Sequence, residues 1–395
     1  MTITAVIYLI VKFVEITVIT LSGIAISRLP KNMPSKCYWQ IAIWAIMAYA
    51  CGEGLRWGHM NDYNYLCQDY YSISGFFELT RNPLWSTIIY TCRIIGIRYN
   101  FFIFLQCGFL FYSIMLLVRK YSKYAAYILP LAVIGILGNE NYIRWFTAFS
   151  FLLIGLYFFI NNKNVKAYIF IFMAVMIHFG YMFIFIIFLL FKPLNRLNLN
   201  SYILCGLVVF SILFADITFF SDSISELSTF LISMGLTEDV NDGFGYLGIA
   251  GSVVGGEYES GITTSSVYAK IIKIATHVPV ILFAKKIVPQ NVQYYNSFYN
   301  IYAVGILLGQ FLFQVELLSR YAILFVFFFC VVGGIFYKSL LQEKKHLVYQ
   351  LIVIVGILSY FIPYVKAPFV RDDVDMYFLW DSEGQEMNRK VMTIG

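Results

Sequence analysis

Residues 100–138 decide the fold of this chain, and they read NFFIFLQCGFLFYSIMLLV (100–118), RKYSK (119–123) and YAAYILPLAVIGILG (124–138). The first run has no charged side chain and is about as long as a helix must be to cross the hydrocarbon core of a bilayer. A short basic cluster separates it from a second uncharged run. This stretch therefore predicts two consecutive membrane-spanning helices joined by a charged turn.

The same alternation extends over the whole chain. Hydrophobic residues make up 60% of the 395 residues and charged residues only 13%, whereas soluble proteins average about 25% charged residues. The pattern predicts an all-α, polytopic transmembrane helical bundle with about 10–12 membrane segments, of which one or two are re-entrant or broken. The expected segments lie near residues 4–27, 38–52, 100–118, 124–138, 145–160, 167–191, 201–220, 267–284, 297–315, 321–337 and 347–365.

Charge indicates which connections lie on which side of the membrane. Residues 221–266 carry seven Asp and Glu residues but no Lys or Arg, so they are predicted to be an external loop, as are residues 51–99. All these segments form one predicted transmembrane domain, residues 1–365, and residues 366–395 form a polar C-terminal tail. Six basic clusters are expected in the cytoplasm: Arg28, Lys31 and Lys36; Arg119, Lys120 and Lys123; Lys163 and Lys166; Lys192 and Arg196; Lys285 and Lys286; Lys338, Lys344 and Lys345.

Segment 167–191 does not fit this assignment as a single span. A single span has its ends on opposite sides of the membrane, but the lysines that flank this segment are both expected in the cytoplasm. A broken helix that turns back near His178 and Gly180 would resolve the conflict, since such breaks are tolerated where they line a protein cavity. One ordinary span with a local violation of the charge rule is the alternative. Residues 84–97 are too short and too charged to span the membrane, and they predict an interfacial or re-entrant helix.

The first part of the expected external loop, residues 51–65, is rich in ionisable side chains: Glu53, Arg56, His59 and Asp62. Such a density at the mouth of a span suggests a binding site. The competing interpretation is a solvated loop that aromatic side chains such as Tyr63 and Tyr65 anchor in the membrane interface.

Further ionisable residues interrupt the apolar segments themselves. Arg144 lies in the first turn of an expected span, His178 interrupts another, and Glu316, Ser319 and Arg320 form a third polar break. A functional role is the default hypothesis at such depths, although arginine can snorkel to the headgroups and a lone histidine is often a packing residue. Two arginines and a histidine on one membrane face would suit a lipid-linked diphosphate, because guanidinium binds phosphate oxygens in a bidentate manner.

Signatures of several other functions are absent. We find no phosphate-cradling Gly-Lys-Ser/Thr loop, no paired-cysteine zinc pattern and no nucleophile elbow, which disfavours ATP-driven transport. The acidic run Arg371–Asp375 lies in a polar tail and is interpreted as solvated, so neither a metal nor a cofactor is expected. The net charge of +6 comes from the clusters between spans, so no nucleic acid is expected as a partner.

Several of these polar elements, taken in order, resemble the EpsG-like family, which belongs with the Wzy-type polysaccharide polymerases. The similar elements are Arg56 through Asp62-Tyr63-x-Tyr65, then Asn141-Tyr142-Ile143-Arg144, then Ile177-His178, and finally Ser319-Arg320-Tyr321. Trp145 departs from the family pattern, which commonly has Gln there, and Tyr65 stands one position early. The resemblance covers nearly the whole chain.

The resemblance implies a multispan glycosyltransferase of the bacterial cytoplasmic membrane. Such an enzyme joins undecaprenyl-diphosphate-linked oligosaccharide repeats on the outer face, giving capsule, O-antigen or exopolysaccharide. The donor carries a good leaving group, so neither metal nor nucleotide is required, and membrane lipid and a possible chain-length regulator are expected partners. The implied roles are diphosphate binding by Arg56, Arg144 and Arg320, proton transfer by His178, Asp62 or Glu140, and sugar binding by Tyr63 and Tyr65, with Tyr70, Tyr71 and Tyr246 as further aromatic candidates.

Two other functions fit parts of the pattern. A flippase or transporter of lipid-linked sugars would also need a broken helix and buried arginines, but transporters commonly contain internal repeats, and we detect none. A membrane acyltransferase is compatible with His178 on an apolar helix, yet the paired acidic or Asn partner that this class predicts is missing near the histidine.

Overall fold

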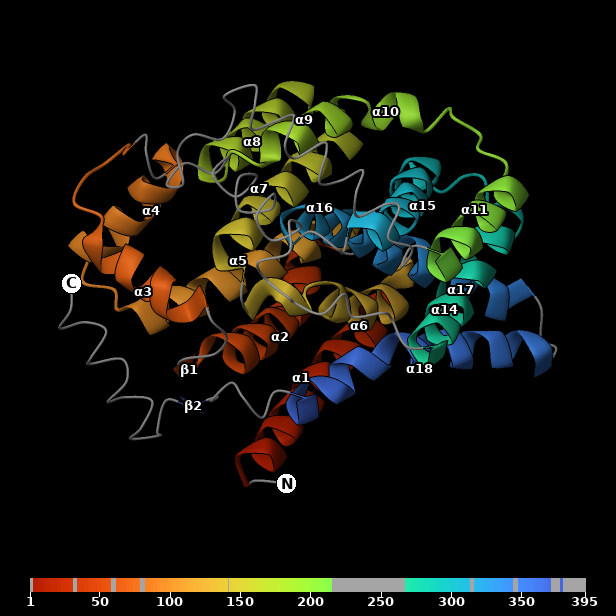
Figure 1. Cartoon of the computed structure of the whole chain (residues 1–395), viewed down its shortest axis with the longest axis horizontal. Coiled ribbons are helices and arrows are strands. Elements are labelled where there is room, and N and C mark those ends of the chain that lie inside the picture. The colour runs from red at the N-terminus through yellow and green to blue at the C-terminus, as the bar shows by residue number, and fades with distance from the viewer. Residues whose placement is uncertain are drawn as a thin grey trace. The chain divides into compact units, whose positions relative to one another are not determined.

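The computed structural model describes residues 3–30, 34–57, 62–78, 82–140, 142–214, 267–312, 316–343, 347–370 and 377–378 (Figure 1). The contacts between residues divide the chain into two compact units. The first unit contains residues 1–181 and 362–395, and the second unit contains residues 182–361. Each unit is described by itself below, and the expected description as one transmembrane domain with a tail stays a prediction.

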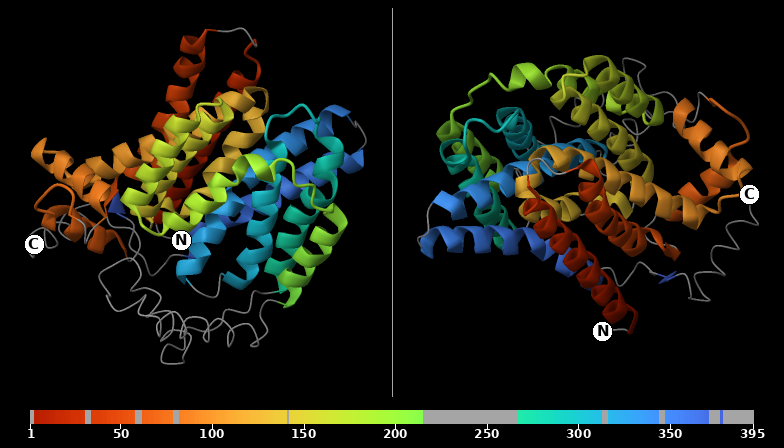
Figure 2. Two further views of the ribbon diagram at one scale, coloured as in Figure 1. Left: turned by 90° about the horizontal axis from the view of Figure 1, so that it is seen from above. Right: turned by 180° about the vertical axis from the view of Figure 1, so that it is seen from behind.

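The first unit is a bundle in which helices pack against chain neighbours and also against helices farther along the chain. Helix α1 packs against α2 and α6, α5 packs against α2 and α7, and α7 and α8 form a helical hairpin, which Figure 2 shows from two further sides. The helices are α1 (Ile3–Ser27), α2 (Ser35–Gly54), α3 (Asp62–Ser72), α4 (Pro83–Ile94), α5 (Tyr99–Val118), α6 (Ala125–Gly135), α7 (Ile143–Ile160) and α8 (Asn164–Ile177), with 3-10 turns η2 (Arg119–Tyr124) and η3 (Leu137–Glu140).

Two glycines allow close approaches between helices of this unit. A Cβ atom at Gly23 of α1 would lie 2.7 Å from the carbonyl oxygen of Ala125, and a Cβ atom at Gly54 of α2 would collide with the Cα atom of Phe104 in α5. Small residues are frequent between membrane helices because backbone-to-backbone packing replaces the hydrophobic effect there. These contacts fix α1 against α6 and the C-terminal end of α2 against α5.

The second unit is built around α15, which packs against α10, α11, α16 and α17, while α14 packs against α11 and α17. The bounds are α9 (Tyr181–Leu189), α10 (Phe191–Leu194), α11 (Ser201–Phe214), α14 (Val267–Ile287), α15 (Tyr295–Leu312), α16 (Glu316–Phe327), α17 (Phe329–Glu343) and α18 (Leu347–Val370). From Ile362 onward, α18 belongs to the first unit.

Two basic clusters that were expected on one side of the membrane lie together in the second unit. The amino group of Lys285 donates hydrogen bonds to the side chain of Asn198 at 3.2 Å and to the carbonyl of Leu199 at 2.8 Å. These acceptors follow the Lys192 and Arg196 cluster in the chain. The C-terminal end of α14 and the N-terminal end of α11 therefore share one end of the unit, and the side of the membrane that this end faces stays a prediction.

The predicted fold class is confirmed, because the chain is a polytopic helical membrane protein. Five described stretches are long and apolar enough to cross a membrane: Val6–Ser27, Tyr99–Gly135, Ile143–Ile160, Val267–Ile287 and Arg320–Gln342. The 37-residue stretch Tyr99–Gly135 contains two expected segments, since its helix axis is interrupted in η2, where Tyr121 has non-helical backbone angles. Shorter apolar helices are Asn164–Ile177, Ser201–Phe214 and Leu347–Ile362.

Segment 167–191 is broken, as one of the two alternatives predicted. Helix α8 ends at Ile177, His178 has extended backbone angles, and α9 begins at Tyr181. The short helix expected over residues 84–97 is also present as α4, and its position at an interface stays a prediction. The expected external loop 221–266 lies outside the described residues.

A two-residue antiparallel strand pair joins distant parts of the first unit. Strand β1 (Arg56–Trp57) follows α2, and β2 (Tyr377–Phe378) follows α18; Trp57 lies opposite Tyr377, and Arg56 opposite Phe378. The region after the second helix and the C-terminal segment therefore lie at the same end of this unit.

This pairing predicts a specific cross-link. Opposite residues of an antiparallel pair have Cβ atoms about 4.5–5.5 Å apart, close enough that cysteines there can form a disulfide with small backbone adjustments. We expect Trp57→Cys combined with Tyr377→Cys to cross-link on mild oxidation, as detected by mass spectrometry of the digested protein. The seven native cysteines are free and provide the background signal.

The matched control is Trp57→Cys combined with Phe378→Cys. Neighbouring side chains of a strand point to opposite faces, so this pair should cross-link much more slowly. Equal rates for the two pairs would contradict the register.

Candidate functional site

The backbone N–H groups at the break between α8 and α9 are hydrogen-bonded. In the interior of a membrane, a broken helix must find new acceptors for the backbone N–H groups that it frees. All four N–H groups of residues 178–181 have one: His178 N to Ala174 O at 3.0 Å, Phe179 N to Asn82 Oδ1 at 3.0 Å, Gly180 N to His178 Nδ1 at 3.1 Å, and Tyr181 N to His178 O at 2.9 Å. Particular residues of the chain therefore stabilise the break.

Asn82 supplies the acceptor that lies farthest away in the chain. It immediately precedes α4, it is 6% exposed, and it has a φ angle of +65°. Asparagine tolerates this left-handed conformation better than most residues. Through Asn82, the segment before α4 is attached to the helix break, so the expected interfacial helix and the broken helix form one local assembly.

The His178 side chain is buried inside this break, with 7% of its surface exposed. The ring of Trp145 meets the imidazole edge-to-face, with ring centroids 4.9 Å apart and planes at 90°. Gly180 makes room for both rings, because a Cβ atom there would lie 3.1 Å from His178 Nδ1 and 3.1 Å from the indole of Trp145. The imidazole is thus held on two sides.

Trp145 connects His178 to the second predicted element of the site. It follows Arg144 in the first turn of α7, and its carbonyl oxygen accepts a hydrogen bond of 2.8 Å from the Tyr181 hydroxyl. Arg144 itself is half-buried. The structure therefore brings the Arg144 helix start and His178 together within the first unit, although they are far apart in the sequence.

A buried amide pair holds the chain just before Arg144. Gln106 of α5 donates to the Asn139 side chain at 3.0 Å, and Asn139 donates back to the Gln106 side chain at 3.3 Å. Gln106 also reaches the carbonyl of Ile143, the first residue of α7, at 3.5 Å. Asn139 lies in η3, so this pair fixes the turn from which α7 begins. Glu140 is the last residue of η3, and its side chain lies outside the described residues.

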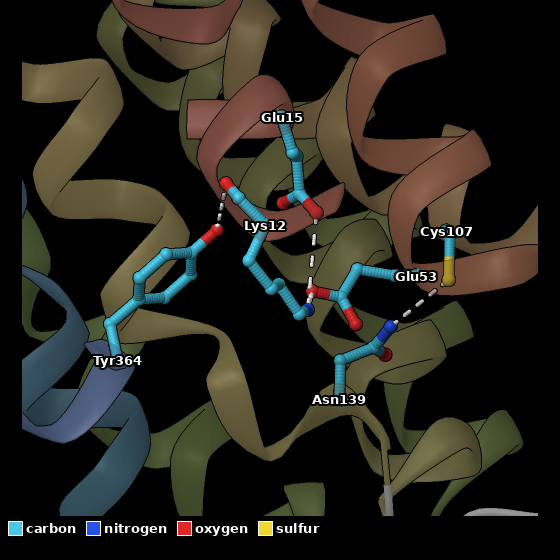
Figure 3. A network of polar contacts seen from close by, with 6 residues as sticks. All are labelled: Lys12, Glu15, Glu53, Cys107, Asn139 and Tyr364. Atoms are coloured by element: carbon cyan, nitrogen blue, oxygen red, sulfur yellow. Dashed lines mark hydrogen bonds and ion pairs between the residues drawn. The ribbon is translucent and has the colours of Figure 1, made fainter. Parts of the chain in front are cut away.

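The first unit also contains a cluster of buried charges that the sequence analysis did not identify. Lys12 of α1 forms an ion pair with Glu53 at the end of α2, and the Glu15 carboxylate lies 3.9 Å from the Lys12 amino group (Figure 3). All three side chains are about 2% exposed. The Tyr364 hydroxyl of α18 donates to the Lys12 carbonyl oxygen at 2.9 Å. The signal was present in the sequence, as two opposite charges three residues apart inside an apolar run.

The remaining predicted residues of the outer loop are described only as backbone. Arg56 lies in β1, and Asp62, Tyr63 and Tyr65 lie in the first turns of α3. Tyr70, farther along α3, is fully buried and donates a hydrogen bond of 2.7 Å to the carbonyl of Ile97. Burial raises the pKa of its hydroxyl above the usual value. Tyr70 thus packs inside this unit, and its expected contact with sugar stays a prediction.

Arg320 belongs to the second unit, where it is 9% exposed on α16. Its neighbour Tyr321 contacts the ring of Phe183 edge-to-face, with centroids 6.2 Å apart. Because Arg144 and Arg320 lie in different units, their predicted joint grip on one diphosphate stays a prediction. A further histidine of this unit, His277, was not predicted as a site residue, and its Nδ1 atom is 2.8 Å from the Tyr302 hydroxyl.

Within the described part of the chain, no group of three His, Cys, Asp or Glu side chains is arranged to hold a metal ion. The acidic run Arg371–Asp375 lies outside the described residues.

A bundle of apolar helices that encloses a hydrogen-bonded helix break, buried ion pairs and a half-buried arginine defines a polytopic membrane protein with a polar site in its interior. The chain belongs to the EpsG family, whose family model matches residues 39–378. This family is one of Wzy-type polysaccharide polymerases. No curated protein and no solved structure matches the chain.

The buried ion pair leads to a prediction about stability. Lys12→Met leaves the Glu53 carboxylate buried without its ion-pair partner, and breaking a buried pair in this way costs about 3–5 kcal/mol. We expect a corresponding fall in the thermal unfolding temperature of the detergent-solubilised protein. The double variant Lys12→Met with Glu53→Leu should recover part of the loss, because two apolar residues can replace a buried pair, while Glu15 still lacks the Lys12 amino group.

The exposed residue Lys36 provides the matched control, since Lys36→Met removes the same charge from the surface. If the losses from Lys12→Met and Glu53→Leu simply added in the double variant, the two side chains would not be coupled.

Proposed function

We propose that this protein is a glycosyltransferase that polymerises undecaprenyl-diphosphate-linked oligosaccharide repeats at the outer face of the bacterial cytoplasmic membrane. The observation that carries the proposal is the assembly of the Arg144 helix start with His178 at the helix break, in a member of the EpsG family. The products are a capsule, an O-antigen or an exopolysaccharide. Besides the lipid-linked glycan, the proposed partners are membrane lipid and a regulator of chain length.

The chemistry fits the types of residue present. A hydroxyl oxygen of the acceptor sugar attacks the anomeric carbon of the donor, and the bond from that carbon to the diphosphate oxygen breaks. The lipid diphosphate leaves with the bonding electrons, and the hydroxyl proton goes to a base of the protein, for which Asp62, Glu140 and His178 are the candidates. The reaction needs placement and charge stabilisation, and neither a nucleotide nor a metal is part of this scheme.

Arginines supply the charge stabilisation in this scheme. Negative charge grows on the diphosphate as it leaves, and preorganised donors in a site that excludes water stabilise such charge more strongly than water does. Arg144, Arg320 and Arg56 are the proposed diphosphate ligands, because the planar guanidinium matches pairs of phosphate oxygens. Tyr63 and Tyr65 are proposed to pack against the sugar rings.

A flippase is the second candidate, and the helix break is the observation that favours it. Transporters also place interrupted helices at their substrate sites. The two functions differ in their product, since only a polymerase makes longer glycans.

The test uses purified protein in liposomes with a synthetic undecaprenyl-diphosphate repeat unit and no nucleotide. We expect a ladder of longer glycans on a gel. Arg144→Ala and Arg320→Ala should each lower the rate of chain growth by about 10²–10³-fold, the usual cost of removing one preorganised donor from developing charge.

Arg28→Ala is the control, because Arg28 is exposed after the end of α1 and has no role in the scheme. Full chain growth in either of the two site variants would remove that arginine from the mechanism. Movement of the lipid across the bilayer without chain growth would support the flippase.

A further inference from the structure

We propose that Gly180 and Trp145 hold His178 as a hydrogen-bond donor to the diphosphate of the lipid-linked substrate, so that His178 is not the base of the reaction. The inference rests on the proposed function for the identity of the ligand. The tautomer of the imidazole, on which the inference depends, follows from the structure of the helix break alone.

The Gly180 amide determines which imidazole nitrogen carries hydrogen. The backbone N–H of Gly180 points at His178 Nδ1, with a distance of 3.1 Å between the nitrogens. A nitrogen that accepts a hydrogen bond must present its lone pair, and in a neutral imidazole the hydrogen is then on the other nitrogen, Nε2. The imidazolium form carries hydrogen on both nitrogens, so this contact disfavours it as well.

The rings around His178 keep the imidazole in this orientation. A half-turn of the ring would replace Nδ1 by a carbon atom opposite the Gly180 N–H and leave that amide without its acceptor, which is costly in a buried site. The edge-to-face contact with Trp145 and the ring of Tyr181, whose centroid is 6.3 Å from that of His178, limit such a turn. The Tyr181 hydroxyl in turn holds the Trp145 carbonyl.

This tautomer gives His178 a defined chemical role. A base needs a free lone pair, but the Nδ1 lone pair is engaged by Gly180 and Nε2 carries hydrogen. Nε2–H is a donor, and donors bind most strongly to charged acceptors such as phosphate oxygens. The hydrogen stays on Nε2 while the diphosphate leaves, and the acceptor proton goes to a carboxylate, Asp62 or Glu140.

Trp145 and Gly180 are positioning residues, since they act on the substrate through His178. Trp145 also follows Arg144 directly in α7. One helix start therefore supplies both a proposed diphosphate ligand and the aromatic side chain that orients the proposed donor. The structure couples the two groups that would contact the same anion.

Two amide substitutions distinguish a donor from a base. The Gln side chain can place an NH₂ group where His178 has Nε2–H, whereas the shorter Asn side chain places its amide near Nδ1, and neither amide can act as a base. We expect His178→Gln to retain chain growth within about 10-fold of wild type and His178→Asn to lose about 10²–10³-fold, the range for removal of a catalytic donor. Both variants are measured in the liposome assay described above.

The outcomes separate this inference from the proposed function. If wild type makes longer glycans and the two variants are equally inactive, His178 is a base and the inference is wrong. If both variants match wild type, His178 has no role and the inference is also wrong. If the wild-type protein does not lengthen the glycan in this assay, the proposed function fails, and the tautomer is then tested by itself.

Nitrogen NMR of the protein labelled on its histidines provides that second measurement. The chain has four histidines, and the His178→Gln variant identifies the signals of His178 by their disappearance. We expect Nε2 to carry hydrogen and Nδ1 to be unprotonated. A hydrogen on Nδ1 would overturn the inference whatever the catalytic result.

Gly180→Ala tests the positioning role. The added Cβ atom would crowd both the imidazole and the indole, so it should slow chain growth in the wild-type background. In the His178→Asn background it should have little further effect, because residues that act through one another are not additive. An equal additional loss in both backgrounds would contradict positioning through His178.

Discussion

The lack of water inside a membrane is the constraint on which this structure depends. A helix that breaks in the apolar interior frees backbone C=O groups where it ends and backbone N–H groups where the next helix begins, and only the protein itself can bind them. At the break after α8, the four N–H groups of residues 178–181 have acceptors: one from the helix, one from Asn82 and two from His178, its imidazole and its carbonyl. His178, the ionisable residue of this segment, thus also supplies two of the four acceptors at the break.

The same constraint explains the pairing of charges in the first unit. Isolated charges are expensive in a low-dielectric interior, and Lys12 and Glu53 lie in direct contact. The Lys12 amino group is also 5.2 Å from the centre of the Tyr8 ring, at a distance where a cation and an aromatic face attract each other. Polar side chains in this unit therefore join α1, α2 and α18 where apolar packing alone would allow them to slide.

Much of the fold could be predicted from the sequence, because membrane crossing depends on local composition. The segments follow from runs of apolar residues, and the break at His178 was one of the two alternatives that the lysines on both sides of one segment left open. The missed features are contacts between distant residues. Glu53 is 41 residues from Lys12, and Asn82 is 97 residues from Phe179, so neither pairing leaves a local pattern.

The individual residues of the candidate site could be predicted from the sequence, but the contacts that bring them together could not. Arg144 and His178 were identified because they are ionisable residues in apolar segments, and the family resemblance implied a role for both in one reaction. The contact between them passes through Trp145, which stands where the family commonly has Gln. Composition could not indicate that an indole orients the imidazole, because aromatic residues are 19% of this chain and their number does not distinguish one from another.

The first unit is formed by two segments far apart in the chain, residues 1–181 and 362–395, and this has a consequence for biosynthesis. Its earliest helix carries the Lys12 carbonyl that accepts the Tyr364 hydroxyl, a partner 352 residues later in the chain. Helices enter the membrane in the order of synthesis, and the residues of the whole second unit are made in between. Helix α1 is therefore made and inserted well before α18, and the packing of the first unit is complete only after α18 has been made.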